Sequence, residues 1–304
     1  MGAAAQPLMP AQPSPKPPAK RMRFAQIRLN FDQILFSFVV LPVSLISLTS
    51  KGHTGGDFEA KSLGLPPLLD ACIEYTDPLE TNMTKPLVHT TRLAGAYRRY
   101  LQSADPCRFA HEVDESYTAA TLNALLSRGQ VEQRRAAALA LGMLGDRCSV
   151  DALGRAISDS DRGVRLVADD SFRAVLVRDA APLHHQQLLR VMHLNDGGEY
   201  AAALSPAMIL IDQAPCYSEA HHQLAICWHG LEDFSRAQQA YQNCLWHCRF
   251  HYLAWQSLAK IRYLNGHLEK SLQALDHCLA INPDLETARM QRRQIRRQLR
   301  QSDV

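Results

Sequence analysis

Two stretches of this chain, SEAHHQLAICWHGLEDFSRAQQAYQNCLWHCRFH (218–251) and YLAWQSLAKIRYLNGHLEKSLQALDHCLAINPDL (252–285), align over 34 residues without a gap. Each stretch has apolar residues at helical spacing in two segments, which predicts a pair of helices. We expect the pairs to stack, because neither helix can bury its apolar face alone. The matching columns hold Leu224-Ala225 and Leu258-Ala259, Ala237 and Ser271, Tyr241 and Leu275, and Cys244-Leu245 and Cys278-Leu279.

These columns resemble the tetratricopeptide repeat (TPR) family, in which small residues stand where two helices cross closely and large ones fill the gaps beside them. The resemblance implies that residues 182–304 hold three repeats and a capping helix, at about 184–217, 218–251, 252–285 and 286–301. The first repeat is degenerate, since Arg190 stands where Leu is usual. Pro206 falls inside its second helix and should kink or delay that helix.

A second repeat pattern covers residues 114–181. The run RRAAALALGMLGD (134–146) and the following SVDALGRAIS (149–158) alternate as two helix types, each with one apolar face. The pattern resembles short bacterial HEAT-like repeats, including those of phycobilisome lyases. In that family the matching residues are structural, so the resemblance implies a scaffold and transfers no catalytic residue.

The N-terminal part is less regular. Residues 1–55 are expected to be disordered or to resemble a signal or anchor, and residues 56–113 to form a linker with irregular helices. The apolar run Ile34–Leu48 is shorter than the roughly 20 residues of a membrane-spanning helix. It fits a signal or anchor, a segment lying on the membrane or on the repeats, or an over-extended translation start without function.

These patterns predict an all-α fold, an alpha-alpha superhelix or solenoid of HEAT-like and TPR hairpins. The composition agrees, because 46% of the residues are hydrophobic but only 7% are aromatic. There are eight cysteines, scattered through helical pattern, which favours free thiols over a disulfide framework. We expect Cys227, Cys244 and Cys278 to be buried, reduced packing residues.

Candidate chemistry is sparse. Cys244, His247, Cys248 and His251 are of the residue types that bind zinc. Helical spacing places only some of them on one face, which favours a packing role over a metal site. Further candidates are better read as groove or surface histidines (His221, His222, His229) and as a solvated acidic face (Asp169-Asp170). No phosphate-binding loop, nucleophile elbow or HExxH motif occurs. The sequence therefore predicts that the protein is not an enzyme and that it has no catalytic, cofactor-binding or metal-binding residue.

The last helix carries a basic stripe at helical spacing, made of Arg289, Arg292, Arg293, Arg296, Arg297 and Arg300. A capping helix needs a soluble outer face, which is the favoured interpretation. An acidic protein partner and a nucleic acid remain alternatives, although no aromatic residues for base stacking are interleaved.

The TPR resemblance also implies a binding groove, lined by the first helix of each repeat. Its second, fifth, ninth and twelfth positions correspond to Glu219, His222, Ile226 and His229, and to Leu253, Gln256, Lys260 and Tyr263. The degenerate first repeat adds His185, Leu188, Met192 and Asn195. The carboxylate-clamping set of Lys, Asn and Arg found in some family members is missing. The expected occupant is therefore an amphipathic or extended segment held by apolar contacts.

The predicted function is that of a protein-interaction scaffold or adaptor, with another protein as its partner and no cofactor. Nucleic acid is not the expected partner, and a membrane contact depends on Ile34–Leu48. The alternatives are a lyase-like or enzyme accessory protein of the HEAT-repeat type and a membrane-anchored assembly factor. The expected location is the cytoplasm, or a membrane or exported compartment if the N-terminal apolar run acts as a signal.

Overall fold

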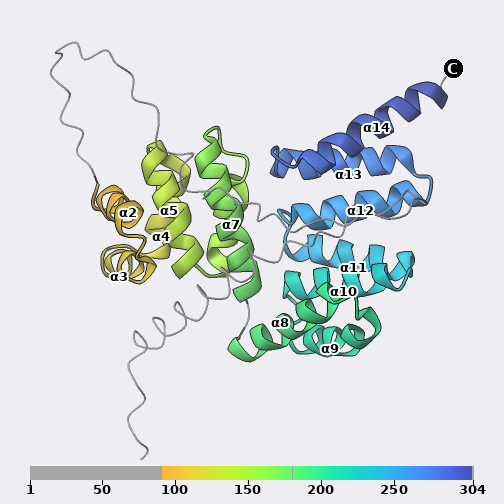
Figure 1. The fold of residues 1–304 in the computed structure, drawn as a ribbon, viewed down its shortest axis with the longest axis horizontal. Helices are drawn as coiled ribbons and strands as arrows, with labels where there is room; N and C mark the ends of the chain where they lie inside the picture. Colours follow the sequence, from red (N-terminus) through yellow and green to blue (C-terminus); the bar gives the residue numbers. More distant parts are fainter. Residues whose placement is uncertain (1–90, 180, 303–304) are drawn as a thin grey trace, which may run out of the picture. The chain divides into compact units, whose positions relative to one another are not determined.

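The computed structural model describes residues 91–179 and 181–302, and every regular element within them is a helix. The all-α class predicted from the sequence is therefore confirmed (Figure 1). Among the described residues, no helix is both long enough and apolar enough to cross a bilayer. The predictions for Ile34–Leu48 and for the signal or anchor lie outside the described residues, as does most of the expected linker.

The first half of the described chain is a series of short helices that start at polar caps. The side chains of Thr91, Asp105, Thr118 and Asp161 each accept a hydrogen bond from a backbone N–H three residues later. These residues therefore set the first turn of four helices. The elements are α2 (Arg92–Ser103), α3 (Pro106–Ser116), α4 (Ala119–Arg128), α5 (Val131–Leu144), the short 3-10 helix η2 (Arg147–Ser149), α6 (Val150–Ala156) and α7 (Arg162–Arg178).

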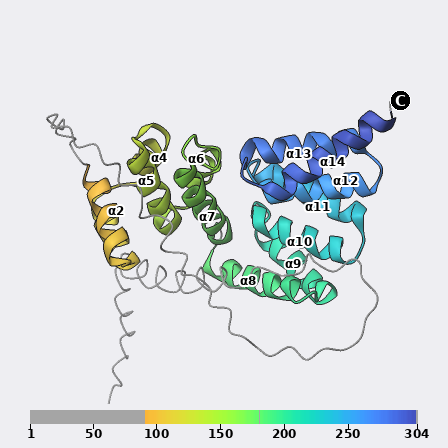
Figure 2. The same ribbon diagram turned by 45° about the horizontal axis from the view of Figure 1, so that its top comes forward.

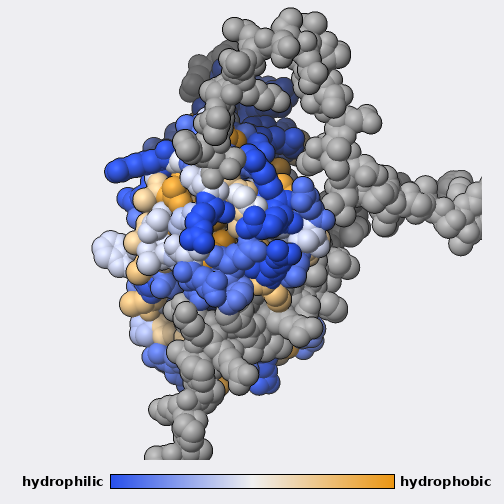
Figure 3. Space-filling model, turned by 90° about the vertical axis from the view of Figure 1, so that its left-hand side faces the viewer, coloured by the Kyte–Doolittle hydropathy of each residue, from blue (hydrophilic) through white to orange (hydrophobic). Residues whose placement is uncertain are grey.

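Apolar side chains of these helices face a shared core. The buried residues of α2 are mostly apolar. Figure 3 shows the outer side of the molecule near α2, where the visible side chains are mainly hydrophilic with scattered apolar ones. The core includes Leu93, Phe109, Leu141, Leu153 and Phe172, each at most 2% exposed. The side of the molecule near α2 and α3 is thus a polar surface over a packed interior.

The second half consists of successive helical hairpins followed by one further helix. The helices are α8 (Pro182–Asp196), α9 (Tyr200–Gln213), α10 (Ser218–Gly230), α11 (Phe234–His247), α12 (Tyr252–Leu264), α13 (Leu268–Ile281) and α14 (Glu286–Ser302). Both helices of the α10–α11 hairpin begin and end 34 residues before their counterparts in α12–α13. The period read from the sequence is therefore also the period of the structure.

The turn inside each hairpin repeats as well. Gly198, Glu232 and Gly266 stand in the same repeat column, and all three adopt a positive φ, of 73°, 62° and 76°. Glycine accepts this left-handed conformation without a steric cost, whereas Glu232 must be held in it by the surrounding hairpin. The column identifies 182–213 as a hairpin of the same kind as the two that follow it.

Two details of this half bear on the sequence predictions. Helix α9 includes Pro206 and begins at Tyr200, the column equivalent to the first residue of α11. Of the predicted kink or delay, the delay is therefore wrong. Cys227, Cys244 and Cys278 are fully buried free thiols, which confirms their packing role. At the α12–α13 crossing Ser271 is also fully buried, and its hydroxyl donates to the carbonyl of Ala259 at 2.7 Å.

Figures 1 and 2 show α7 passing one end of the hairpins, and its side-chain and backbone contacts there are with the starts of later helices. The hydroxyl of Tyr217 donates to the carbonyl of Val177, and that of Tyr252 donates to Asp169 Oδ1 at 2.6 Å. Near the start of α7, Arg165 pairs with an aspartate just before α14, Asp284, at 2.8 Å. Successive sites along one helix therefore meet the starts of α10, α12 and α14.

These contacts correct the prediction that Asp169-Asp170 is simply a solvated acidic face. Asp169 is half-buried and accepts the hydrogen bond from Tyr252, and only Asp170 is exposed, beside Arg173.

Helix α6 also approaches the turn before α12 closely, at the same junction between the two halves of the described chain. A Cβ added at Gly154 would lie 2.5 Å from the ring of Phe250, so a side chain there would displace that ring.

Candidate functional site

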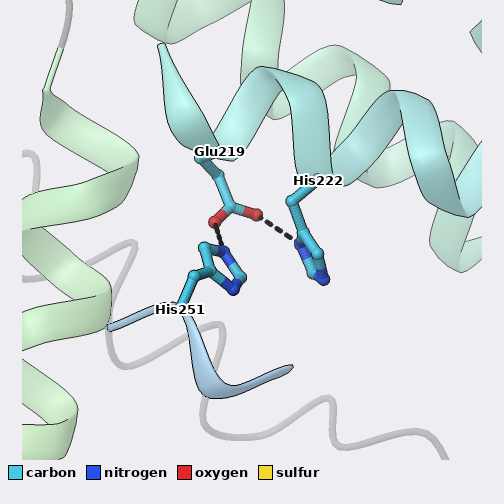
Figure 4. Close-up of side chains that lie close together, drawn as sticks. All are labelled: Glu219, His222 and His251. Atoms are coloured by element: carbon cyan, nitrogen blue, oxygen red, sulfur yellow. Dashed lines mark hydrogen bonds and ion pairs between the residues drawn. The ribbon is translucent and has the colours of Figure 1, made fainter. Parts of the chain in front are cut away.

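A buried carboxylate between two histidines lies where α10 and α12 begin (Figure 4). Glu219 is the second residue of α10, His222 lies one turn further along it, and His251 caps the start of α12. His222 Nδ1 is 3.1 Å from Glu219 Oε1, and His251 Nε2 is 3.0 Å from Oε2. The three residues are between 3% and 7% exposed, so this polar cluster belongs to the interior.

The hydrogen-bond partners determine which ring nitrogens carry protons. The backbone N–H of Ala254 donates to His251 Nδ1 at 3.2 Å, so the proton of the neutral ring is on Nε2. His251 therefore donates to the carboxylate. His222 donates from Nδ1, and the side-chain amide of Gln223 donates to Oε1 at 2.9 Å. Three donors thus converge on one ionised carboxylate, an arrangement that satisfies a buried charge.

The same network extends back to the first hairpin. The amide of Asn195, at the end of α8, donates to Gln223 Oε1 at 2.9 Å and to the Gln223 carbonyl at 3.1 Å. The thiol of Cys227 donates to Asn195 Oδ1 at 3.1 Å. A continuous buried chain of hydrogen bonds therefore links α8, α10 and the start of α12, the first helices of three consecutive hairpins.

The charges of the cluster follow from burial and from these partners. Burial alone raises the pKa of Glu219, but the interactions with His222 and His251 outweigh it and hold this pKa far below its ordinary value. Burial lowers the pKa of His251, and the neighbouring His222 lowers it further, against the raising effect of Glu219. The folded protein therefore keeps Glu219 ionised and favours a neutral His251.

Stability should fall as the pH decreases from about 7 to 5. Below about 6.5 the unfolded chain binds a proton on His251 that the folded chain disfavours, and below about 4.5 the same holds for Glu219. The slope is at most about 1.4 kcal/mol per pH unit for each group. Asp179 opposes this trend, because burial raises its pKa to about 6.

Denaturant unfolding of the wild type and of Asp179→Asn at several pH values measures both effects. The variant lacks the opposing carboxyl, so its stability should decline more steeply between pH 6 and 5 than that of the wild type. Stability that rises towards pH 5 in Asp179→Asn would contradict the account of the buried cluster.

The cluster also has the residue types of a metal site. One ligand atom from each of Glu219, His222 and His251 lies within 4.8 Å of the others, and one carboxylate with two imidazoles is a donor set that zinc accepts. However, a metal on His251 Nε2 would move the proton to Nδ1, which would then face the Ala254 N–H. The geometry therefore favours a hydrogen-bond network over metal coordination.

The four zinc-like residues noted in the sequence do not gather in one place. His251 joins Glu219, whereas His247 stacks on His221 with ring centroids 5.1 Å apart. Cys244 and Cys248 are buried, and burial raises the pKa of both thiols, that of Cys248 to about 12. These two cysteines therefore stay protonated, which is unfavourable for metal binding.

The pairing of Glu219 with His251 is not evident from either helix alone, because the residues are 32 positions apart and belong to different repeats. A signal was present in the repeat register. Glu219 is the second residue of one repeat, and His251 immediately precedes the first residue of the next. The start of α12 reaches the start of α10 through this pair, so the two columns meet.

The expected groove positions divide by exposure. Glu219 and His222 are buried in the cluster, and Lys260 is exposed. The remaining five are half-buried: Ile226, His229, Leu253, Gln256 and Tyr263. In the first repeat Met192 is half-buried, and the other three expected positions are buried: His185, Leu188 and Asn195.

Helix α14 contacts two of the half-buried positions. The amide of Gln256 donates to Thr287 Oγ1 at 2.8 Å, and the amide of Gln298 donates to the hydroxyl of Tyr263 at 3.0 Å. Helix α14 therefore contacts α12 at two of the positions that the sequence predicts to line a groove. Within the described residues, the side chains of Ile226, His229 and Lys260 form no hydrogen bond with α14.

The arginines of α14 are partly engaged within the protein. Arg292 and Arg296 both pair with Asp276 of α13, at 3.2 and 3.5 Å, and Arg289 pairs with residues at the start of α14. Three further arginines are exposed and form no ion pair within the described residues: Arg293, Arg297 and Arg300. Two of the six arginines of the stripe thus fasten the last helix to α13.

Comparisons with known proteins found no matching family model and no curated relative. Among solved structures, the TPR2AB-domain:pHSP90 complex of yeast Sti1 is similar over 67% of this chain and 88% of its own, with 13% sequence identity and a TM-score of 0.34. A likeness at that level carries no information about function. The helix bounds and the recurring turn column themselves show an all-α solenoid whose second half is built of TPR-like hairpins.

Proposed function

We propose that the protein is a non-catalytic scaffold that holds a segment of another protein along the first helices α10 and α12. The matched bounds of these helices carry the proposal, because equivalent columns stand at the same place in consecutive hairpins. On this proposed binding face Ile226 and His229 are half-buried, and Lys260 is exposed. Such a strip of repeated positions suits an extended or amphipathic segment.

The buried network supports this role by fixing the distance between the two helices. Glu219 of α10 and His251 at the start of α12 are joined by a charge-assisted hydrogen bond inside the protein. The binding face is therefore ordered before a partner arrives, which lowers the entropy cost of association. The same burial keeps Glu219, His222 and His251 away from any substrate, which argues against a catalytic use of these groups.

The side chains on the face indicate the chemistry of the partner. Ile226 offers an apolar contact, and Lys260 offers a positive charge. Burial lowers the pKa of His229, and the nearby Lys260 lowers it further, so this histidine is neutral at pH 7. We expect a segment with an apolar anchor and a single acidic residue rather than a highly charged one.

The test begins with a partner captured by the full chain and identified by mass spectrometry. Ile226→Asp should then weaken binding by about tenfold or more, because it places a charge in the apolar contact. Gln239→Asp is the matched control, since Gln239 is exposed on α11, the second helix of the same hairpin. Equal affinity of the two variants in folded protein would place the binding site elsewhere.

A further inference from the structure

A cavity of about 640 Å³ opens between α11 and α13, beside the C-terminal end of α12. This volume falls within the range of small-molecule sites, roughly 300–1,000 Å³. Its lining shares no residue with the binding face proposed above, whose residues lie on the first helices. The cavity is therefore a separate candidate site, formed by the second helices α11 and α13 together with the end of α12.

The lining of this cavity is cationic. Of its nine residues, Arg262 and Lys270 carry permanent positive charge, and none carries a carboxylate. Most of the others offer neutral hydrogen-bonding groups: Ser235, Gln238, Gln242, Asn265 and Gln273. The first turn of each of α11 and α13 also contributes to the wall, where the helix dipole adds a partial positive charge. The two cationic side chains and the two helix starts favour a negatively charged ligand.

The strongest feature is the uncompensated charge of Arg262. This side chain is half-buried, and burial lowers its pKa. Its Nη1 donates to the carbonyl of Lys270 at 3.1 Å, but no carboxylate pairs with it within the described residues. Elsewhere the partly buried Arg134 and Arg165 each pair with an aspartate at 2.8 Å. An anion in the cavity would supply the counter-charge that Arg262 lacks.

We propose that this cavity binds a small phosphorylated molecule whose phosphate is held by Arg262 and Lys270. The planar guanidinium matches the oxygen atoms of a phosphate in a bidentate way, and the lysine adds a point charge. The contact with the Lys270 carbonyl holds the guanidinium in place and leaves further N–H donors for the ligand. The surrounding amides and the ring of Phe234 contact the rest of the molecule.

Calorimetric titration of the full chain with phenyl phosphate tests the proposal at low ionic strength. Saturable binding is expected, and Arg262→Gln should raise the dissociation constant by about tenfold or more. Arg262→Lys keeps the charge but loses the planar guanidinium that binds phosphate in a bidentate way, so its dissociation constant should lie between those of the wild type and Arg262→Gln. The matched control is Arg293→Gln, an exposed arginine of α14 outside the cavity, which loses the same charge and should change affinity less than about twofold.

Lys270→Gln provides a second variant at an exposed position, so a folding defect of Arg262→Gln would not end the test. It should also weaken phenyl phosphate binding. Three results would overturn the proposal: no saturable binding by the wild type, equal weakening by the Arg293 and cavity variants, or unchanged affinity in both Arg262→Gln and Lys270→Gln. Phenol serves as the ligand control, and its binding with equal affinity would show that the phosphate is not recognised.

Discussion

Replacing Glu219 with alanine should lower the free energy of unfolding by about 3–5 kcal/mol, because it removes the acceptor of a buried charged network. The change leaves the N–H groups of His222, His251 and Gln223 without their partner, and each buried unsatisfied donor costs about 1–3 kcal/mol. Glu219→Gln retains one acceptor oxygen and should lie between alanine and the wild type. Chemical denaturation at pH 7 measures both variants.

Glu269→Ala is the control for this substitution. Glu269 is also the second residue of its helix, α13, but it is exposed. Its loss should change the free energy of unfolding by no more than about 0.5 kcal/mol. If Glu219→Ala behaved like Glu269→Ala, the buried network between α10 and α12 would not exist in solution.

Tyr252→Ala should also be strongly destabilising, by about 3–5 kcal/mol, because it removes a large buried side chain. Tyr252 is 4% exposed, and its hydroxyl donates to Asp169 on α7. The substitution therefore opens a cavity where α7 meets the start of α12. Tyr252→Phe keeps the ring and removes only the hydrogen bond, so its cost should be about 1–3 kcal/mol.

Trp246→Ala removes an even larger aromatic side chain from α11, but one that is 86% exposed. Its effect on stability should stay within about 0.5 kcal/mol. A small effect of Tyr252→Ala, similar to that of the tryptophan, would mean that α7 does not pack against the hairpins as described.

The hairpins of residues 182–302 were predictable because their determinants are local. The 34-residue period places small residues such as Ala237 and Ser271 at each helix crossing, and Asp233 caps α11 with a hydrogen bond to the N–H of Arg236. The delay expected from Pro206 did not occur, because the preceding turn at Gly198 fixes the start of α9 in the same register as its neighbours. The repeated turn thus outweighed the local effect of proline on where the helix begins.

The contacts between distant segments were not predictable from periodicity. Nothing in the sequence around Asp169 indicates that it meets Tyr252, 83 residues later, because both residues also suit a solvated helix face. The pairing of Glu219 with His251 similarly requires two repeats to be placed side by side. Polar residues that satisfy each other in the interior look like surface residues when only their own helix is considered.

Site-specific photo-crosslinking tests the proposed binding face most directly. A photoreactive amino acid at position 226 or 260 lies on the first helices, and one at position 239 lies on the exposed side of α11. The account predicts that the captured partner crosslinks from positions 226 and 260 but not from 239, and that the same short partner segment is labelled from both. Crosslinks from position 239 with none from 226 or 260 would contradict it.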